Sequence, residues 1–89
     1  MTKEKFLQIV EDGVSRNRTF MVVKISTEGN PAPEIIINSA ENFKQKIGYY
    51  KSAHNDNMEL TKAKESGKLI KITDVLLTSN LTDLSWFAY

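Results

Sequence analysis

His54 is the only side chain in this 89-residue chain whose ordinary pKa suits general acid–base catalysis near neutral pH. It follows two adjacent tyrosines, Tyr49 and Tyr50, and precedes Asn55-Asp56. Serine and aspartate also occur, but no nucleophile-elbow sequence supports a catalytic triad. We therefore expect His54 to end a helix, where the helix dipole favours a cation. The chain is predicted not to be an enzyme, with a small enzyme built on His54 as the less favoured alternative.

Metal and cofactor sites are not expected either. The chain has no cysteine and a single histidine, so thiolate sites, disulfides and histidine-pair sites are excluded. Its four glycines are isolated and form no phosphate-binding loop. The stretch 55–66 is rich in acidic and amide residues but lacks the spacing of an EF-hand. We assign no catalytic, cofactor-binding or metal-binding residue.

Lysines are concentrated in the second half of the chain. The overall charge is only +1, which does not by itself indicate a nucleic-acid partner. A solvated lysine-rich face explains the pattern, but a phosphate-facing surface is the alternative. The candidate phosphate-facing residues are Lys44, Lys51, Lys62, Lys64 and Lys68.

The stretch LSWFAY, 84–89, places three large aromatic side chains at the end of the chain. Chain ends fray unless they are tied down, so these side chains must dock either on the chain's own core or on another molecule. A homodimer through this tail is one such arrangement. Aromatic residues are frequent anchors of interfaces. The candidate partner-binding residues are Tyr49, Lys51, His54, Trp86, Phe87 and Tyr89.

Composition is typical of one folded domain, 1–89, since 40% of residues are hydrophobic and 26% charged. The N-terminal sequence lacks the apolar core of a signal peptide, and no apolar run reaches membrane-spanning length. We expect a cytoplasmic protein without membrane contact. The absence of cysteine fits a reducing compartment.

The first half of the chain predicts one helix and a hairpin. Residues 3–15 carry Phe6, Val10 and Val14 on one helical face, with Thr2 as N-cap. Residues 19–27 predict a strand that is apolar on both faces and therefore central. A six-residue turn, 28–33, leads to a second strand at 34–38, which Pro33 marks as an edge strand.

A second helix is expected over about 40–54. Asn38 and Glu41 have capping-box spacing, and Ser39 is an equally good N-cap. Phe43, Ile47 and Tyr50 form its apolar row, and Gly48 would permit close approach to the sheet. The pattern predicts a helix whose apolar row faces the sheet.

The last third of the sequence is harder to interpret. Residues 57–65 fit either a strand or a helix, and alternation of Met58 and Leu60 favours the strand. Residues 68–78 predict a further strand, with a bulge or early end near Asp74. The tail after it forms either one helical turn or an apolar arm. The expected fold is α+β in the order α-β-β-α-β-β, an antiparallel sheet with two helices on one face.

The stretch 34–60 resembles a family of uncharacterised small proteins from prophages, phages and conjugative elements of Gram-positive bacteria, mostly Firmicutes. The shared pattern is an Ile-rich strand at 35–38, Glu41-Asn42, Tyr49-Tyr50, Ala53 to Asp56, and an alternating segment at 58–60, with His54 in place of the usual aromatic residue. The resemblance extends over roughly residues 33–74, about half of the chain, and carries no assigned catalytic residues. It implies a single-domain binder of mobile-element origin. The leading hypothesis is a non-enzymatic protein-interaction module with a host bacterial protein as partner, and an anti-CRISPR-like inhibitor of host defence is one form that it could take. A nucleic-acid- or nucleotide-binding protein is the alternative.

Overall fold

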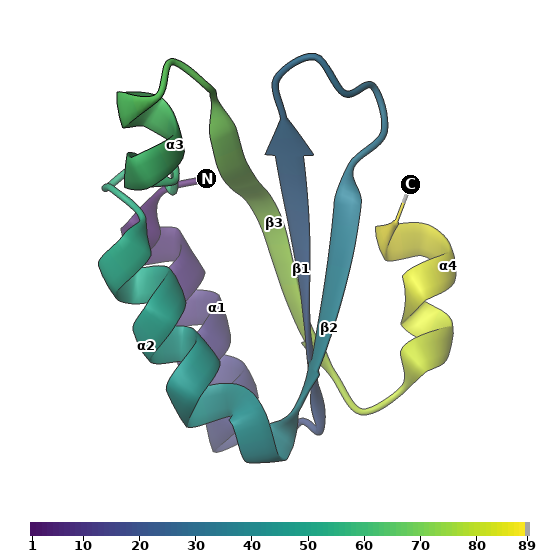
Figure 1. Cartoon of the computed structure of the whole chain (residues 1–89). Helices are drawn as coiled ribbons and strands as arrows, with labels where there is room; N and C mark the ends of the chain where they lie inside the picture. Colours follow the sequence, from purple (N-terminus) through teal and green to yellow (C-terminus); the bar gives the residue numbers. More distant parts are fainter. Residues whose placement is uncertain (89) are drawn as a thin grey trace.

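The computed structural model describes residues 1–88 of the chain. Three antiparallel strands, β1 (Phe20–Thr27), β2 (Glu34–Ser39) and β3 (Ile70–Thr78), form a sheet in the order β2-β1-β3. Helices α1 (Lys3–Ser15) and α2 (Phe43–Ala53) lie side by side on one face of this sheet (Figure 1). The short helix α4 (Leu84–Phe87) lies on the opposite face (Figure 1). The expected α+β class, with two helices on one face, is confirmed.

The main core lies between the sheet and the α1–α2 layer. Alternation along β1 sends Met21 and Val23 into this core, and the facing residues of β3 do the same. The helices contribute one apolar row each. The buried members of this core are Phe6, Val10, Met21, Val23, Phe43, Tyr50, Met58, Ile72, Val75 and Leu77.

The second face of the sheet is covered in part by α4. Val22 points to this face and is fully buried. Lys24, on the same face of β1, lies with its Nζ 4.9 Å from the ring centre of Phe87, which is itself buried. The central strand is therefore enclosed on both faces, as its apolar alternation predicted.

The boundaries of the first elements follow the sequence expectations closely. The Thr2 hydroxyl caps α1 by accepting a hydrogen bond from the Lys5 backbone N–H at 3.1 Å. β2 is an edge strand, as Pro33 indicated. The bulge expected near Asp74 is also present: Asp74 faces Lys24 and Ile72 faces Ile25, so Thr73 is the extra residue.

The start of α2 differs from the expectation. A 3₁₀ turn, η1 (Ala40–Asn42), precedes the helix, and neither a capping box nor a side-chain cap forms. The Ser39 hydroxyl instead donates to the Glu41 carboxylate at 3.1 Å. Asn38 cannot cap because it is still part of β2, where its side chain points into the core.

The preference for a strand over residues 57–65 was wrong. Only two isolated bridges form, His54 with Leu60 and Glu59 with Lys71. Helix α3 (Thr61–Glu65) follows at once, so the observed order is α-β-β-α-α-β before the C-terminal turn. The reason lies at Met58, whose positive φ of 58° interrupts the extended backbone just before the short contact that Glu59 and Leu60 make with β3. The good helix formers of the run KAKE then close a helical turn.

The C-terminal segment forms a 3₁₀ turn, η2 (Leu81–Asp83), followed by α4. Of the two forms that the sequence allowed, the helical turn is the one observed. Burial of Phe87 shows that this segment docks on its own chain. Tyr89, the last aromatic residue of the predicted anchor set, lies outside the described residues.

Candidate interaction surface

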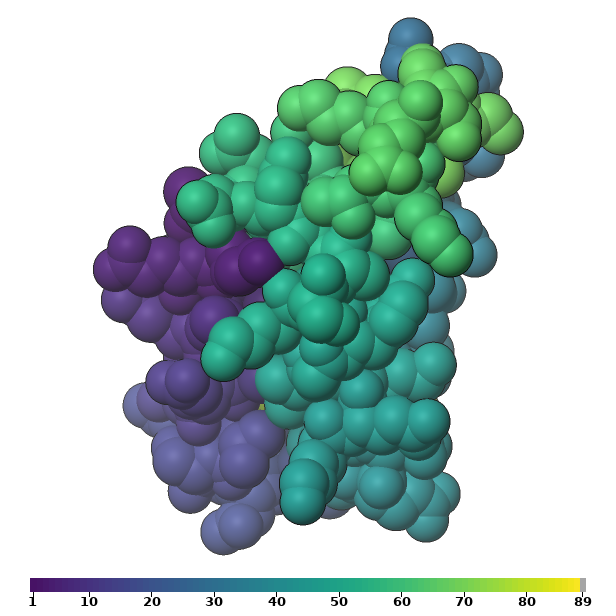
Figure 2. Space-filling view, turned by 60° about the vertical axis from the view of Figure 1, so that its left-hand side comes forward, coloured from purple at the N-terminus to yellow at the C-terminus, as the bar shows by residue number. Residues whose placement is uncertain are grey.

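A furrow runs between α1 and α2 on the helical side of the molecule. It consists of two adjoining hollows of about 500 Å³ and about 370 Å³, and Val14 and Ile47 line both of them. Figure 2 shows the two helices, in purple and teal, meeting along this line. The floor is apolar. The other apolar residues lining it are Leu7, Val10, Ala40 and Phe43.

The furrow lies where α1 packs closely on β3, near the C-terminal end of the helix. Gly13 is buried there, and a β-carbon on it would overlap the Leu77 side chain. This close approach turns the next residue, Val14, away from the sheet, so its side chain is 46% exposed. The row Phe6-Val10-Val14 predicted three core residues, but only the first two are buried. The sequence did not reveal this furrow, because which turn of the helix touches the sheet depends on tertiary packing.

The rim of the furrow is basic. Arg18 and Lys44 line the first hollow, and Lys51 lines the second. Glu11 is the one acidic side chain among the residues lining them. The positive electrostatic potential of this rim therefore favours a negatively charged partner over the apolar floor.

His54 ends α2 as predicted, and it is buried there. Its ring is 6% exposed, and Nδ1 lies 2.9 Å from the backbone carbonyl oxygen of Tyr50, to which Nδ1–H donates. Burial lowers the pKa of His54, while this hydrogen bond partly opposes the shift and nearby Lys3 adds to it. The imidazole satisfies an orphan carbonyl of the last helical turn and offers little surface to a partner.

The two adjacent tyrosines have different surroundings. Tyr50 is buried, with its ring 5.9 Å from that of Phe6 at 74°. Burial raises the pKa of the Tyr50 phenol, and the Asn38 amide partly counters this effect. Tyr49 is 51% exposed and stands edge-on to Tyr50 and to His54. Of the two, only Tyr49 presents its ring to solvent.

The C-terminal aromatic residues also differ in their exposure. Phe87 is buried under Lys24, whereas Trp86 is 59% exposed, with its indole N–H donating to the Asp83 carboxylate at 3.4 Å. α4 and α2 lie on opposite faces of the sheet (Figure 1). Tyr49 and Trp86 therefore do not share one surface. Lys51 belongs to the furrow instead.

The candidate phosphate-facing lysines are also divided between elements. Lys44 and Lys51 are on α2 at the furrow, Lys62 and Lys64 are on α3, and Lys68 follows the turn at Gly67. Lys64 is not free, because its Nζ lies 3.0 Å from the Glu59 carboxylate. The five lysines are thus distributed over α2, α3 and the turn that follows α3.

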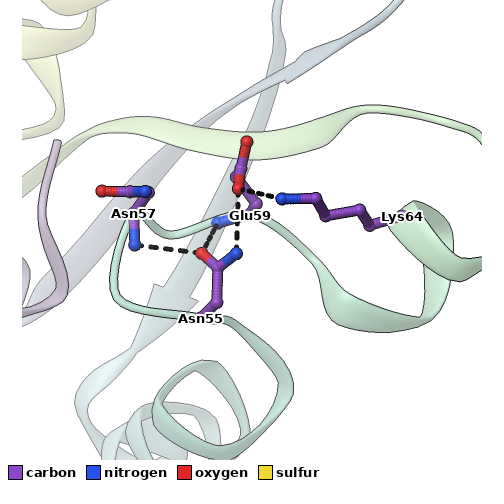
Figure 3. A network of polar contacts seen from close by, with 4 residues as sticks. All are labelled: Asn55, Asn57, Glu59 and Lys64. Carbon is purple, nitrogen blue, oxygen red and sulfur yellow. Dashed lines mark hydrogen bonds and ion pairs between the residues drawn. The ribbon is translucent and has the colours of Figure 1, made fainter.

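The Asn-rich exit from α2 forms a polar clamp (Figure 3). The Asn55 side-chain oxygen accepts hydrogen bonds from the backbone N–H groups of Asn57 and Glu59, each at 3.0 Å. Its amide nitrogen donates to the Glu59 carboxylate at 2.8 Å. That carboxylate also holds Lys64, and the hydrogen bond from Asn55 is the main reason that the pKa of Glu59 is lowered. The clamp fixes the turn that inserts Met58 into the core, so its role is structural.

No group of three or more metal-binding side chains is found within residues 1–88. None of the helices in this part of the chain is both long and apolar enough to cross a membrane. Comparisons of the chain with protein-family models, curated proteins and solved structures find no match.

Proposed function

We propose that this chain is a non-enzymatic protein-interaction module that binds an acidic, amphipathic helical segment of a partner protein in the α1–α2 furrow. The observation that carries the proposal is the half-exposed Val14 on an apolar floor between two helices. An apolar side chain held open in a furrow is the usual receptor for the apolar face of a helix.

Charge selects the chemistry of the partner. Arg18, Lys44 and Lys51 surround the floor, and only Glu11 opposes them among the lining residues. Acidic side chains flanking the apolar face of a partner helix would meet these cations at the rim. Such rim pairs chiefly steer and orient the partner, while burial of Val14 and Ile47 supplies most of the affinity.

The resemblance to small proteins of phages and conjugative elements favours a host bacterial protein as this partner, in the cytoplasm. Inhibition of a host defence system, in the manner of an anti-CRISPR protein, is the biological role that we propose. The partner is defined here by its chemistry alone: it presents an exposed, acidic, amphipathic helix.

The test is a pull-down from host lysate with three forms of the chain: wild type, Val14→Asp and Leu81→Asp. Leu81 is also a partly exposed apolar residue, but it lies in η2, outside the furrow, so it is a matched control. We expect at least one host protein to be retained by wild type and by Leu81→Asp and to be lost with Val14→Asp. Identical retention by all three forms, or no retention at low salt, would count decisively against the furrow.

Nucleic-acid or nucleotide binding through Lys44, Lys51, Lys62, Lys64 and Lys68 is the second candidate, and the division of these lysines between elements makes it weaker. It predicts affinity that falls steeply with salt. The absence of a mobility shift with DNA, RNA or cyclic nucleotides at low salt would remove it. An enzyme based on His54 is weaker still, since that imidazole is buried and already bonded to the helix.

A further inference from the structure

β2 forms an edge of the sheet that nothing covers in the described part of the chain. The other edge strand, β3, is partly covered, because the Leu60 N–H donates to the Ile70 carbonyl and the Ile72 N–H donates to the Met58 carbonyl. No comparable backbone hydrogen bond from another segment of residues 1–88 reaches β2. Alternate backbone N–H and C=O groups along β2 therefore face outward without a strand partner.

Beyond Pro33 and Glu34 at its start, this open edge also lacks the usual protection against pairing. Edge strands commonly carry a lysine, a bulge or an inward-pointing charge that keeps other strands away. β2 instead carries three consecutive isoleucines, Ile35, Ile36 and Ile37, and its single charge is Glu34 at the start. Ile37 is 45% exposed on the α4 side of the sheet.

A second, independent observation comes from Asn38, at the far end of the strand. Its side chain is 7% exposed, and its Nδ2 makes no full hydrogen bond among the described residues, although the amide lies close enough to the Tyr50 hydroxyl to lower the pKa of that phenol. Buried amide N–H groups are nearly always paired in folded proteins. Asn38 faces the helical side of the sheet, the same side as Ile36 and Glu34.

We infer that β2 pairs antiparallel with β2 of a second copy of this chain, with Ile36 on the two-fold axis, to give one continuous six-stranded sheet. In this register, Ile35 lies opposite Ile37 of the second copy on the α4 side. Glu34 lies opposite Asn38 of the second copy on the helical side. Because the dimer is two-fold symmetric, each of these residue pairs occurs twice.

The pairing answers both observations. Directly opposed side chains of an antiparallel pair have Cβ atoms about 5 Å apart, so the four isoleucines would form one cluster and cover Ile37. At the same distance, rotation of the Asn38 amide toward the sheet edge would let it donate to the Glu34 carboxylate, a stronger acceptor than the Tyr50 hydroxyl. No like charges oppose each other, because Glu34 is the only charged residue of the strand.

The same pattern selects a second copy over an unrelated strand. When two copies of the segment Glu34–Asn38 pair about Ile36, apolar side chains oppose apolar side chains, and the acceptor Glu34 opposes the donor Asn38. An unrelated strand would have to supply an acceptor and a donor at this spacing in one register. The pairing is independent of the furrow, so either proposal can fail without the other.

The first test is sedimentation velocity from micromolar to millimolar concentrations. We expect wild type to approach twice its monomer mass of 10.1 kDa. Glu34→Lys should raise the dimer dissociation constant about tenfold or more, because it places a cation opposite an amide donor. Glu65→Lys makes the same charge change on α3 and should leave the dimer intact. A wild type that stays monomeric throughout, or a dimer equally strong in both variants, would overturn the inference.

The second test reports the register. The chain has no cysteine, so a single introduced cysteine can form a disulfide only with another copy. Ile36→Cys should cross-link rapidly under mild oxidation, since the two-fold axis brings residue 36 opposite itself. Ser85→Cys, exposed on α4, is the control and should cross-link only slowly. Faster cross-linking at 85 than at 36 would assign the dimer to the C-terminal tail and reject the β2 pairing.

Discussion

Gly13 of α1 and Leu77 of β3 touch so closely that no other residue fits at position 13: an added β-carbon would overlap the Cβ, Cγ and Cδ2 atoms of the leucine. This contact sets the distance between helix and sheet. It also explains why the furrow exists, because it rotates Val14 out of the core.

Gly13→Ala should destabilise the fold by about 1–3 kcal/mol, since overpacking outweighs the gain in helix propensity. Gly48→Ala is the matched control, because Gly48 lies inside α2 with nothing within 4 Å of an added β-carbon. That change should stabilise the fold by about 0.5–1 kcal/mol. Urea unfolding of both variants measures the contrast; equal effects of the same sign would contradict the contact.

The lowered pKa of His54 predicts an acid-sensitive fold. The folded protein binds the proton less readily than the unfolded chain, whose histidine has a pKa near 6.5, so stability is complete above 6.5 and falls as the pH drops below it. This single group can change the free energy of unfolding by at most about 1.4 kcal/mol per pH unit. His54→Phe should remove the dependence in this range. Unfolding curves taken about one pH unit above and below 6.5 test this pH dependence. If His54→Phe loses stability equally steeply, the dependence belongs to other groups.

Asn55→Ala should cost about 1–3 kcal/mol, because three hydrogen bonds are lost at the turn that inserts Met58. The pKa of Glu59 should also rise toward its ordinary value, since Asn55 is the largest cause of its lowering. Asn57→Ala removes a similar side chain that makes no bond in the clamp and should have little effect. Thermal unfolding and a carboxyl titration by NMR give the two readouts; an unmoved Glu59 pKa would refute the clamp.

Phe87→Ala should destabilise the fold by about 2–4 kcal/mol, because the ring is buried on the second face of the sheet. The adjacent Trp86→Ala should change the stability by less than about 1 kcal/mol, since that ring is largely exposed. Denaturant unfolding distinguishes them. A larger cost for Trp86 than for Phe87 would mean that the wrong aromatic residue has been taken as the anchor of α4.

Local patterns were informative where one residue decides one feature. Thr2 marked the start of α1, Pro33 marked an edge strand, and the slip near Asp74 marked a bulge. The apolar alternation of residues 20–25 correctly indicated a central strand. Each of these signals depends on backbone geometry within a few residues, which the sequence determines directly.

The predictions that were wrong share one physical cause, which is tertiary packing. Gly48 was expected to approach the sheet, but it is exposed, and Gly13 makes the close contact instead. Residues 57–65 alternate as a strand does, yet the positive φ of Met58 is imposed by burial of its side chain and by the Asn55 clamp. Of the predicted partner-binding aromatic and histidine side chains, Tyr49 and Trp86 are exposed, whereas His54 and Phe87 are buried. The furrow was not predicted, because it depends on how two helices pack together.

The position of α4 has a consequence for synthesis on the ribosome. Val22 lies early in the chain, but α4, residues 84–87, covers the face of the sheet to which it points (Figure 1). A nascent chain that already holds α1, β1 and β2 leaves one edge of β1 unpaired until β3 has emerged, and exposes apolar surface on this face until residue 87 has emerged. Stalling or premature release before that point would yield a product prone to aggregation rather than a smaller folded domain.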